Sequence, residues 1–281
     1  MSNWSATIEV LGWWIDTVNP HDRLEPEKRT KLIRLISDWP ASRHQASVRE
    51  IQRLTGLLLH VSFVIRPGRF FVRRLWRAAG LRAPQENLQS AVWESRPDAH
   101  MRLHLGPEFH GDLDFWRCLS SCMHNPNSHV LTAPLHAFLD RQPVRTMFSD
   151  ASGVAVGGYS AETGRWWRYD LQEDQRARVK GSSVHSKDDL SINVLELMGM
   201  VVSAFNLVVT EQARPSNPRD PVLLRGDNQS AVHWINRCRG KEPRSGALMR
   251  ILGLLEIRGG WKFEAKHIPG ILNQAADGIS R

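Results

Sequence analysis

The sequence predicts an α/β protein, in which a mixed sheet flanked by helices is preceded by a smaller, mainly helical region. Two observations support this fold class. Between 143 and 281, strand-like and helix-like stretches occur in the order meander, helix, strand, helices, strand, helix, which suits a sheet with helices on its faces. Between 26 and 80, the apolar residues instead follow helical spacing. With 281 residues, 41% of them hydrophobic, the chain is long enough for two modest domains.

We expect the chain to divide into three segments. Residues 1–82 form a hairpin and a helical region, and residues 143–281 form the α/β domain. Residues 83–142 form a connection between them. This segment begins with a stretch of prolines and polar residues of weak periodicity, and it carries a single amphipathic helix near 106–123.

The N-terminal stretch 8–18 is rich in β-branched and aromatic residues and predicts one strand. A tight turn at 19–22 and a short return strand complete a hairpin. Three helices follow. The first has Pro26 in its first turn and stops at Pro40. The second begins with a capping box made by Ser47 and Glu50, and the third spans 67–80.

Arginine dominates the charge of the second and third helices. Between 43 and 82 there are nine arginines and one acid, and the whole chain carries a net charge of +8, which favours a polyanionic partner. The third helix should turn its aromatic residues inward and its arginines outward. These arginines either contact phosphates or form an ordinary solvated surface; they are Arg69, Arg73, Arg74 and Arg77.

The C-terminal region begins with three strands that form a meander. Its later elements alternate between helices and buried strands, and a polar loop is expected over 171–190. The expected strands are 144–150, 153–160, 164–171, 221–227 and 261–268, and the expected helices are 192–212, 230–238, 246–259 and 272–281.

Four acidic residues occupy apolar or turn-like contexts in this region. They are Asp150 in MFSDASG, Glu196 in INVLELMG, Asp227 in VLLRGDNQ and Asp277 in NQAADGIS. Burying carboxylates without partners is costly, so several on predicted core elements indicate a cation that offsets their charge. Mg²⁺ is the natural candidate, because it prefers hard oxygen ligands.

Each of these acids also has a simpler interpretation. Asp150 could end a strand at a turn, and Asp227 could cap the helix that follows it. Glu196 and Asp277 could both face solvent on their helices. The sequence alone leaves these alternatives open for each acid taken singly.

Taken together and in this order, the four stretches resemble the ribonuclease H domain of reverse transcriptases. The resemblance is greatest to DIRS-type tyrosine-recombinase retrotransposons, with gypsy-type elements next. The matching motifs are a DAS strand, an IN-x-LEL helix, a DN-x-x-A-V-x-x-IN junction and a HIPG-x-x-N-x-x-AD-x-x-SR ending. The family often has His just before the IN-x-LEL run, where this chain has Ser191.

The resemblance implies a ribonuclease H-like sheet and a metal-dependent endonuclease that cleaves the RNA strand of RNA–DNA hybrids. Two Mg²⁺ ions, for which Mn²⁺ could substitute, would clamp the attacking water and the leaving oxygen. Their ligands would be Asp150, Glu196, Asp227 and Asp277.

Other residues near these acids are candidates for turnover and substrate binding. His267 precedes the last helix and either assists turnover, which suits an imidazole, or packs on Pro269. Three residues that follow Asp227 at the start of a helix are candidate contacts to the RNA 2′-hydroxyl, namely Asn228, Gln229 and Ser230.

The N-terminal half resembles other parts of the same enzymes. LGWWID at 11–16 resembles the hairpin that grips the primer end, although its tryptophans could equally be hairpin core. PGRFFVRRL at 67–75 resembles the thumb and connection. No Y-x-D-D motif of a polymerase palm occurs in the sequence. The chain is therefore similar to the C-terminal part of a reverse transcriptase, whose palm and fingers would be partners.

Two other functions stay open on the sequence, a catalytically idle nucleic-acid-binding remnant and a ribonuclease H-fold nuclease or integrase acting on DNA. No uncharged apolar run reaches the roughly 18 residues that cross a bilayer, and the N-terminus lacks the basic flank and cleavage site of a signal peptide. We therefore expect no membrane partner and an intracellular protein, cytoplasmic or nuclear.

Overall fold

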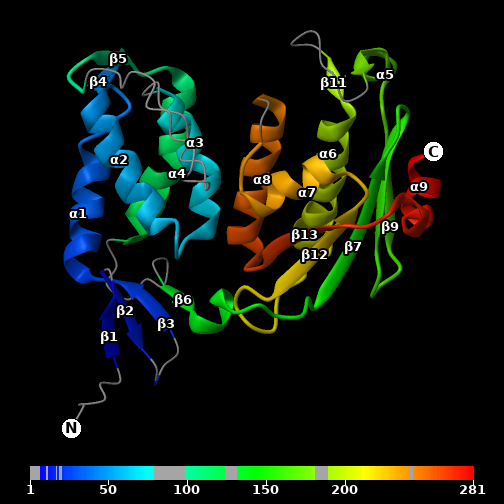
Figure 1. The fold of residues 1–281 in the computed structure, drawn as a ribbon, viewed down its shortest axis with the longest axis horizontal. Helices are drawn as coiled ribbons and strands as arrows, with labels where there is room; N and C mark the ends of the chain where they lie inside the picture. Colours follow the sequence, from blue (N-terminus) through cyan, green and yellow to red (C-terminus); the bar gives the residue numbers. More distant parts are fainter. Residues whose placement is uncertain are drawn as a thin grey trace, which may run out of the picture. The chain divides into compact units, whose positions relative to one another are not determined.

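The computed structural model describes residues 7–10, 12–16, 18, 21–78, 99–123, 132–180, 189–240 and 243–281. The chain divides into two compact units, Met1–Phe138 and Leu139–Arg281 (Figure 1). Much of the expected polar connection, residues 83–98, lies outside the described residues.

The first unit opens with strands rather than with a single hairpin. β1 (Thr7–Val10), β2 (Trp13–Asp16), β3 (His21–Leu24) and β6 (Thr132–Pro134) form an antiparallel four-stranded sheet in that order. The prediction of one strand over 8–18 is wrong. The chain turns at Gly12, whose φ of +81° is a conformation that side chains larger than hydrogen rarely adopt.

Among the described residues, four α-helices accompany this sheet, and the second begins at the signal that the sequence predicts. The Ser47 hydroxyl accepts a hydrogen bond from the Glu50 N–H at 3.2 Å, and the Glu50 carboxylate accepts one from the Ser47 N–H at 2.7 Å, which confirms the capping box. The helices are α1 (Pro26–Ser37), α2 (Val48–Val61), α3 (Arg69–Ala78) and α4 (Pro107–Met123).

Short elements connect these helices. β4 (Gln45–Ser47) pairs with β5 (Arg102–His104), and single helical turns lie at Arg66–Gly68 (η1) and Leu135–Phe138 (η4). The core between the helices is apolar and fully buried, with Leu32, Ile51, Leu54, Leu58, Leu75, Leu113 and Trp116 all 0% exposed.

The second unit contains a five-stranded mixed sheet in the order β13-β12-β7-β8-β9. The three strands that come first in the chain, β7, β8 and β9, form an antiparallel meander. β12 then runs parallel to both β7 and β13. The strands are β7 (Arg145–Ala151), β8 (Ala155–Ser160), β9 (Trp166–Asp170), β12 (Pro221–Gly226) and β13 (Lys262–His267).

Helices cover both faces of this sheet (Figure 1). α6 (Ile192–Phe205) packs on β7 and β8, and α7 (Gln229–Asn236) and α8 (Pro243–Gly259) lie on the same side. α9 (Gln274–Ser280) lies on the other side. The predicted mixed sheet flanked by helices is confirmed by this arrangement.

The region expected to be a polar loop contains regular structure. A short helix α5 (Glu173–Arg178) is followed by β10 (Val179–Lys180), which pairs with β11 (Leu190–Ser191). The loop prediction is therefore wrong for 173–180, because a capping box between Gln172 and Gln175 starts a helix there. Residues 181–188 lie outside the described part of the chain.

One helix of this unit is long and apolar. α6 continues through a π-helical segment, Asn206–Thr210 (η5), and by length and composition alone the helix could cross a membrane, with a mean hydropathy of 1.9. The same stretch is 61% buried inside the unit, as the core helix of a folded domain is, and it carries Glu196. A short turn, Gly270–Leu272 (η6), joins β13 to α9.

Candidate metal and active site

Three of the four predicted acids meet at one end of the five-stranded sheet. Asp150 lies on β7 and Asp227 directly follows β12, its parallel neighbour, so both carboxylates reach the same edge. Glu196 enters from α6, which packs on β7. One carboxylate oxygen from each residue lies within 4.8 Å of the other two.

The burial of these side chains excludes most of the simpler interpretations. Asp150 is 5% exposed and lies inside β7, so it does not end the strand at a turn. Glu196 is 4% exposed and does not face solvent. Asp227 is the most exposed of the three, and the N-cap of the following helix is Asn228 rather than Asp227.

Two polar residues from the C-terminal segment hold Asp150. The Ser280 hydroxyl donates a hydrogen bond of 2.6 Å to Asp150 Oδ2. The Asn273 amide donates to the Ser149 carbonyl at 3.0 Å and lies 3.5 Å from Asp150 Oδ1. Sequence reasoning assigned no role to Ser280 or Asn273, although both stand in the terminal HIPG-x-x-N-x-x-AD-x-x-SR motif.

The carboxylates perturb one another because they are buried together. Burial raises the pKa of Glu196 to about 9, and the charges of Asp150 and Asp227 add to this rise. The hydrogen bond from the Ala151 N–H, 3.3 Å long, acts to lower the pKa of Glu196 but offsets only part of this rise. Burial also raises the pKa of Asp150, although the hydrogen bond from Ser280 acts to lower it. Without a cation, the cluster therefore resists full ionisation.

The donor set fits a hard divalent cation. Glu196 Oε2 is buried and has no hydrogen-bond partner among the described residues. Buried polar atoms are normally bonded, so an orphaned oxygen on a carboxylate that lies beside two others is a ready ligand. All the converging donors are oxygens, which Mg²⁺ and Mn²⁺ accept.

Asp277 does not belong to this group within the part of the chain that the structure describes. It lies on α9, where it makes a 2.8 Å ion pair with Arg281, one helical turn on. Its side chain is 40% exposed. Its charge nevertheless reaches the cluster, since Asp277 contributes to the raised pKa of Asp150.

The other predicted catalytic residue lies beside the cluster. His267 ends β13 and is half-buried, and it pairs with Gly226, the residue just before Asp227. The turn that follows passes close to the site. A methyl group placed on Gly270 would lie 3.1 Å from Asp227 Oδ2, so a larger residue there would crowd this carboxylate.

The predicted 2′-hydroxyl contacts open α7. Asn228 uses its side-chain oxygen as the N-cap, bonding the Ala231 N–H at 3.0 Å. Its amide donates to Asn193 Oδ1 at 2.8 Å. Asn193 stands nearly one turn before Glu196 on α6 and was not predicted. Gln229 is exposed and Ser230 is half-buried.

The four arginines of α3 do not share one role. Arg69 and Arg77 are exposed, as predicted, and Arg73 is half-buried. The prediction that Arg74 points outward is wrong. Its guanidinium forks onto Asp112 of α4, with Nε 2.6 Å from Oδ2, and Asp112 is 0% exposed. A buried carboxylate needs such a partner, and sequence periodicity alone does not reveal it.

Comparison with known proteins returned solved structures. No protein-family model and no curated protein matched the chain. Ribonuclease H1 from the halophilic archaeon Halobacterium salinarum NRC-1 matches at 15% identity and a TM-score of 0.33, covering 48% of this chain and 92% of its own. The foamy viral protease-reverse transcriptase in complex with an RNA/DNA hybrid matches at 11% identity and a TM-score of 0.30, and the match covers 93% of this chain but only 29% of that one. The same viral protein in complex with double-stranded DNA matches at 10% identity and a TM-score of 0.30, and the match covers 94% of this chain and 45% of that one.

Proposed function

We propose that this protein is a metal-dependent endonuclease that cleaves the RNA strand of RNA–DNA hybrids. The observation that carries the proposal is the group formed by Asp150, Glu196 and Asp227, whose carboxylate oxygens lie within 4.8 Å of one another. Glu196 Oε2 is buried there without a hydrogen-bond partner among the described residues. Such a group is stable in the ionised form only with a cation.

Each residue of the cluster has a distinct part in this proposal. Asp150 and Asp227 hold Mg²⁺ from neighbouring strands, and Glu196 completes the ligand set from α6. When bound, the metal supplies a nucleophilic water at neutral pH and stabilises charge on the phosphate. Ser280 and Asn273 hold the carboxylate of Asp150 in place. Asp277 is the proposed ligand of a second ion and would exchange its ion pair with Arg281 for that role.

The substrate is proposed from the groups around the carboxylates. Asn228, Gln229 and Ser230 follow Asp227 directly and offer amide and hydroxyl groups to the RNA 2′-hydroxyl, which distinguishes RNA from DNA. His267, on the neighbouring strand end, is proposed to assist turnover. The exposed arginines of α3, Arg69 and Arg77, are proposed phosphate contacts. In its larger context, the chain is proposed as the C-terminal part of a retrotransposon reverse transcriptase of the DIRS or gypsy type.

The test is cleavage of labelled RNA–DNA hybrid, duplex RNA and duplex DNA in Mg²⁺ and in Mn²⁺. The parent should cut only the RNA strand of the hybrid, and Asp227→Asn should lose this activity by at least about 100-fold, as removal of a major electrostatic group does. Asp174→Asn, which changes an acid on α5 whose side chain is 73% exposed, is the matched control and should cut normally. Cleavage of duplex DNA alone, or hybrid binding without any cleavage, would contradict the proposal.

A further inference from the structure

A row of cationic and aromatic side chains crosses the five-stranded sheet. The strand register pairs Lys266 with Arg225, Arg225 with Phe148, Phe148 with Tyr159, and Tyr159 with Trp166. Residues paired across strands point to the same face of a sheet. The five side chains therefore form one row, the cation–aromatic row, with two cations at one end and three rings at the other.

This row lies on the face that α9 only partly covers. Gly157, two residues before Tyr159 on β8, belongs to the same face and packs directly under α9, since a methyl group there would lie 2.5 Å from Ile279 Cγ2. Several side chains of the row reach solvent. Trp166 is 68% exposed, Lys266 is exposed, and Phe148 and Tyr159 are half-buried.

The rings and the nearer cation form a stacked series. The rings of Phe148 and Tyr159 have centroids 4.9 Å apart and planes only 5° apart. The Arg225 guanidinium lies 5.7 Å from the centre of the Phe148 ring. Cross-strand aromatic pairs stabilise many sheets, which accounts for Phe148 and Tyr159. This does not explain Trp166, a large ring that is left mostly in water at the end of the row.

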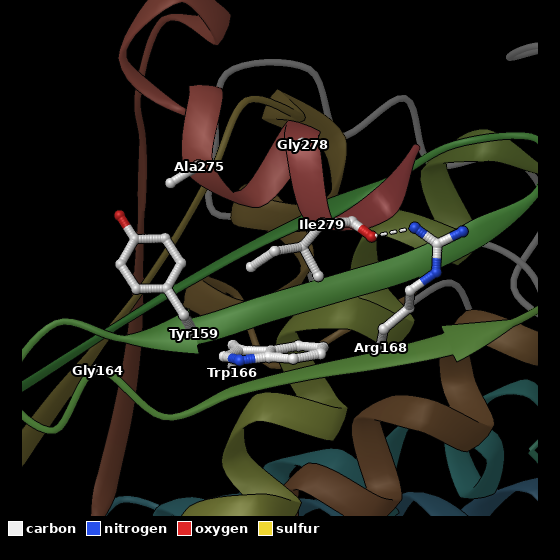
Figure 2. Close-up of a pocket in the computed structure, with 7 residues that line it drawn as sticks. All are labelled: Tyr159, Gly164, Trp166, Arg168, Ala275, Gly278 and Ile279. Atoms are coloured by element: carbon white, nitrogen blue, oxygen red, sulfur yellow. Dashed lines mark hydrogen bonds between the residues drawn. The ribbon is translucent and has the colours of Figure 1, made fainter.

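A cleft opens between the end of this row and α9. Figure 2 shows Tyr159 and Trp166 on the sheet side and Ala275, Gly278 and Ile279 on the helix side. The cleft has a volume of ≈ 520 Å³. Gly278 has no atom within 4 Å of the place where a side chain would begin, so the helix wall leaves room for a flat group.

The charges along the face favour an anionic ligand. On the same face, Glu264 is paired with Lys262 at 2.7 Å, and Asp150 belongs to the carboxylate group already described. Arg168 is engaged with the Ile279 carbonyl and with Asp170, so it serves as a wall of the cleft. Lys266 and Arg225 give one end of the row a positive charge. A ligand that suits it combines flat apolar rings with regularly spaced negative charge.

We propose that the cation–aromatic row binds a single-stranded nucleic-acid segment, with unpaired bases stacked on Trp166 and Tyr159 and phosphates near Arg225 and Lys266. Aromatic platforms with cations beside them bind single strands in this way, without base specificity. Phe148 lies on β7 two residues before Asp150, so a strand bound on the row would continue from a hybrid held at the carboxylates. In this respect the inference rests on the proposed function.

The test measures the binding of labelled oligothymidylate to the full chain by fluorescence anisotropy, in the presence of a chelator. Trp166→Ala should weaken binding by about fivefold to 100-fold, the cost of losing one base–aromatic stack, and Trp166→Phe should retain most of the affinity. Tyr169→Ala is the matched control, since Tyr169 is an exposed ring on the same strand but the opposite face. An abasic oligomer of equal charge should bind the parent at least as weakly as oligothymidylate binds Trp166→Ala, because it loses the stack on Tyr159 as well.

Equal affinity of the parent and Trp166→Ala for oligothymidylate would overturn the proposal, as would equal affinity of the parent for the abasic oligomer. An unchanged melting temperature of Trp166→Ala excludes misfolding as the cause of weaker binding. Cleavage of a short blunt hybrid in Mg²⁺ separates this result from the proposed function. Trp166→Ala should cut it at the parent rate, and Asp150→Asn should bind oligothymidylate as the parent does. Slower cleavage by Trp166→Ala would contradict a site outside the catalytic group.

Discussion

The buried Glu196 side chain makes the metal-free protein sensitive to pH. Its folded pKa of about 9 lies above the ordinary value of 4.5, so its contribution to stability is fully present below pH 4.5 and is lost as the pH rises through about 9. Glu196→Gln keeps a neutral side chain at every pH. In chelator, this variant should therefore melt above the parent by an amount that grows from little near pH 5 to on the order of ten degrees near pH 9.

The melting temperatures of Glu196→Gln and the parent, followed by circular dichroism across this pH range, check the expectation. Glu173→Gln, which removes an exposed carboxylate from α5, is the control. Added Mg²⁺ should reverse the order by stabilising the parent but not Glu196→Gln, because binding to the folded state alone raises its stability. A gain that is the same at every pH would contradict the buried, coupled carboxylate described here.

His267 offers a second test at the scale of a single residue. If it assists turnover, His267→Ala should lower the cleavage rate by roughly 10²-fold or less, the low end for general acid–base groups, and leave hybrid affinity unchanged. Single-turnover cleavage and anisotropy measure the two quantities. An unaltered rate together with a lower melting temperature would instead assign His267 to packing on Pro269.

Sequence patterns located the carboxylates but not the groups that hold them. Asp150, Glu196 and Asp227 each stand in a local motif that a reader of the sequence can recognise. Ser280 and Asn273 reach the Asp150 region across 130 and 124 residues of chain, so no local pattern links them to it. The spacing of Asp277 and Arg281 permits their ion pair, but it does not decide between this pair and a place for Asp277 beside the other three acids.

At the scale of the helix, α3 divides its arginines between two tasks. Replacing Arg69 and Arg77 with Gln should weaken hybrid binding at low salt and flatten the log–log salt dependence by about 0.9 for each lost phosphate contact. Arg74→Gln should instead lower the free energy of unfolding by roughly 3 kcal/mol, because it removes the guanidinium that forks onto the buried carboxylate of Asp112.

Anisotropy over a range of salt concentrations and urea unfolding measure these two effects. An unchanged salt slope in the double variant would mean that the exposed arginines form only a solvated surface. A flatter slope in Arg74→Gln, with its stability intact, would show that Arg74 binds phosphate despite its contact with α4.

Element order was predictable because each element carries its own period and end signals. The capping box at Ser47 and Glu50 and the alternation of β7, β8 and β9 are local facts of the sequence. The predictions fail where a short signal interrupts a longer pattern. Gly12 breaks the expected strand at 8–18, and the Gln172–Gln175 box starts a helix in the expected loop. The strand order of the sheet follows from pairings that sequence periodicity does not contain.

At the scale of the whole molecule, the basic stretch and the carboxylates belong to different compact units. The arginine-rich helices lie in Met1–Phe138, and the three converging acids lie in Leu139–Arg281. The sequence placed this division near residue 143, with an expected separate connection before it. α4, which lies in that expected connection, packs on α1 and α3, so its helix belongs to the first unit. Apolar spacing predicted the helix, whereas its packing partners depend on contacts distant in sequence.

The central claim is that Asp150, Glu196 and Asp227 hold a divalent metal ion. Titration of the full chain with Mn²⁺, followed by electron paramagnetic resonance of the free ion, tests it without relying on activity. The parent and the control Asp174→Asn should both bind Mn²⁺ at a site from which Mg²⁺ displaces it. Asp150→Asn should lose that site. Equal uptake of displaceable Mn²⁺ by the parent and Asp150→Asn would contradict the account.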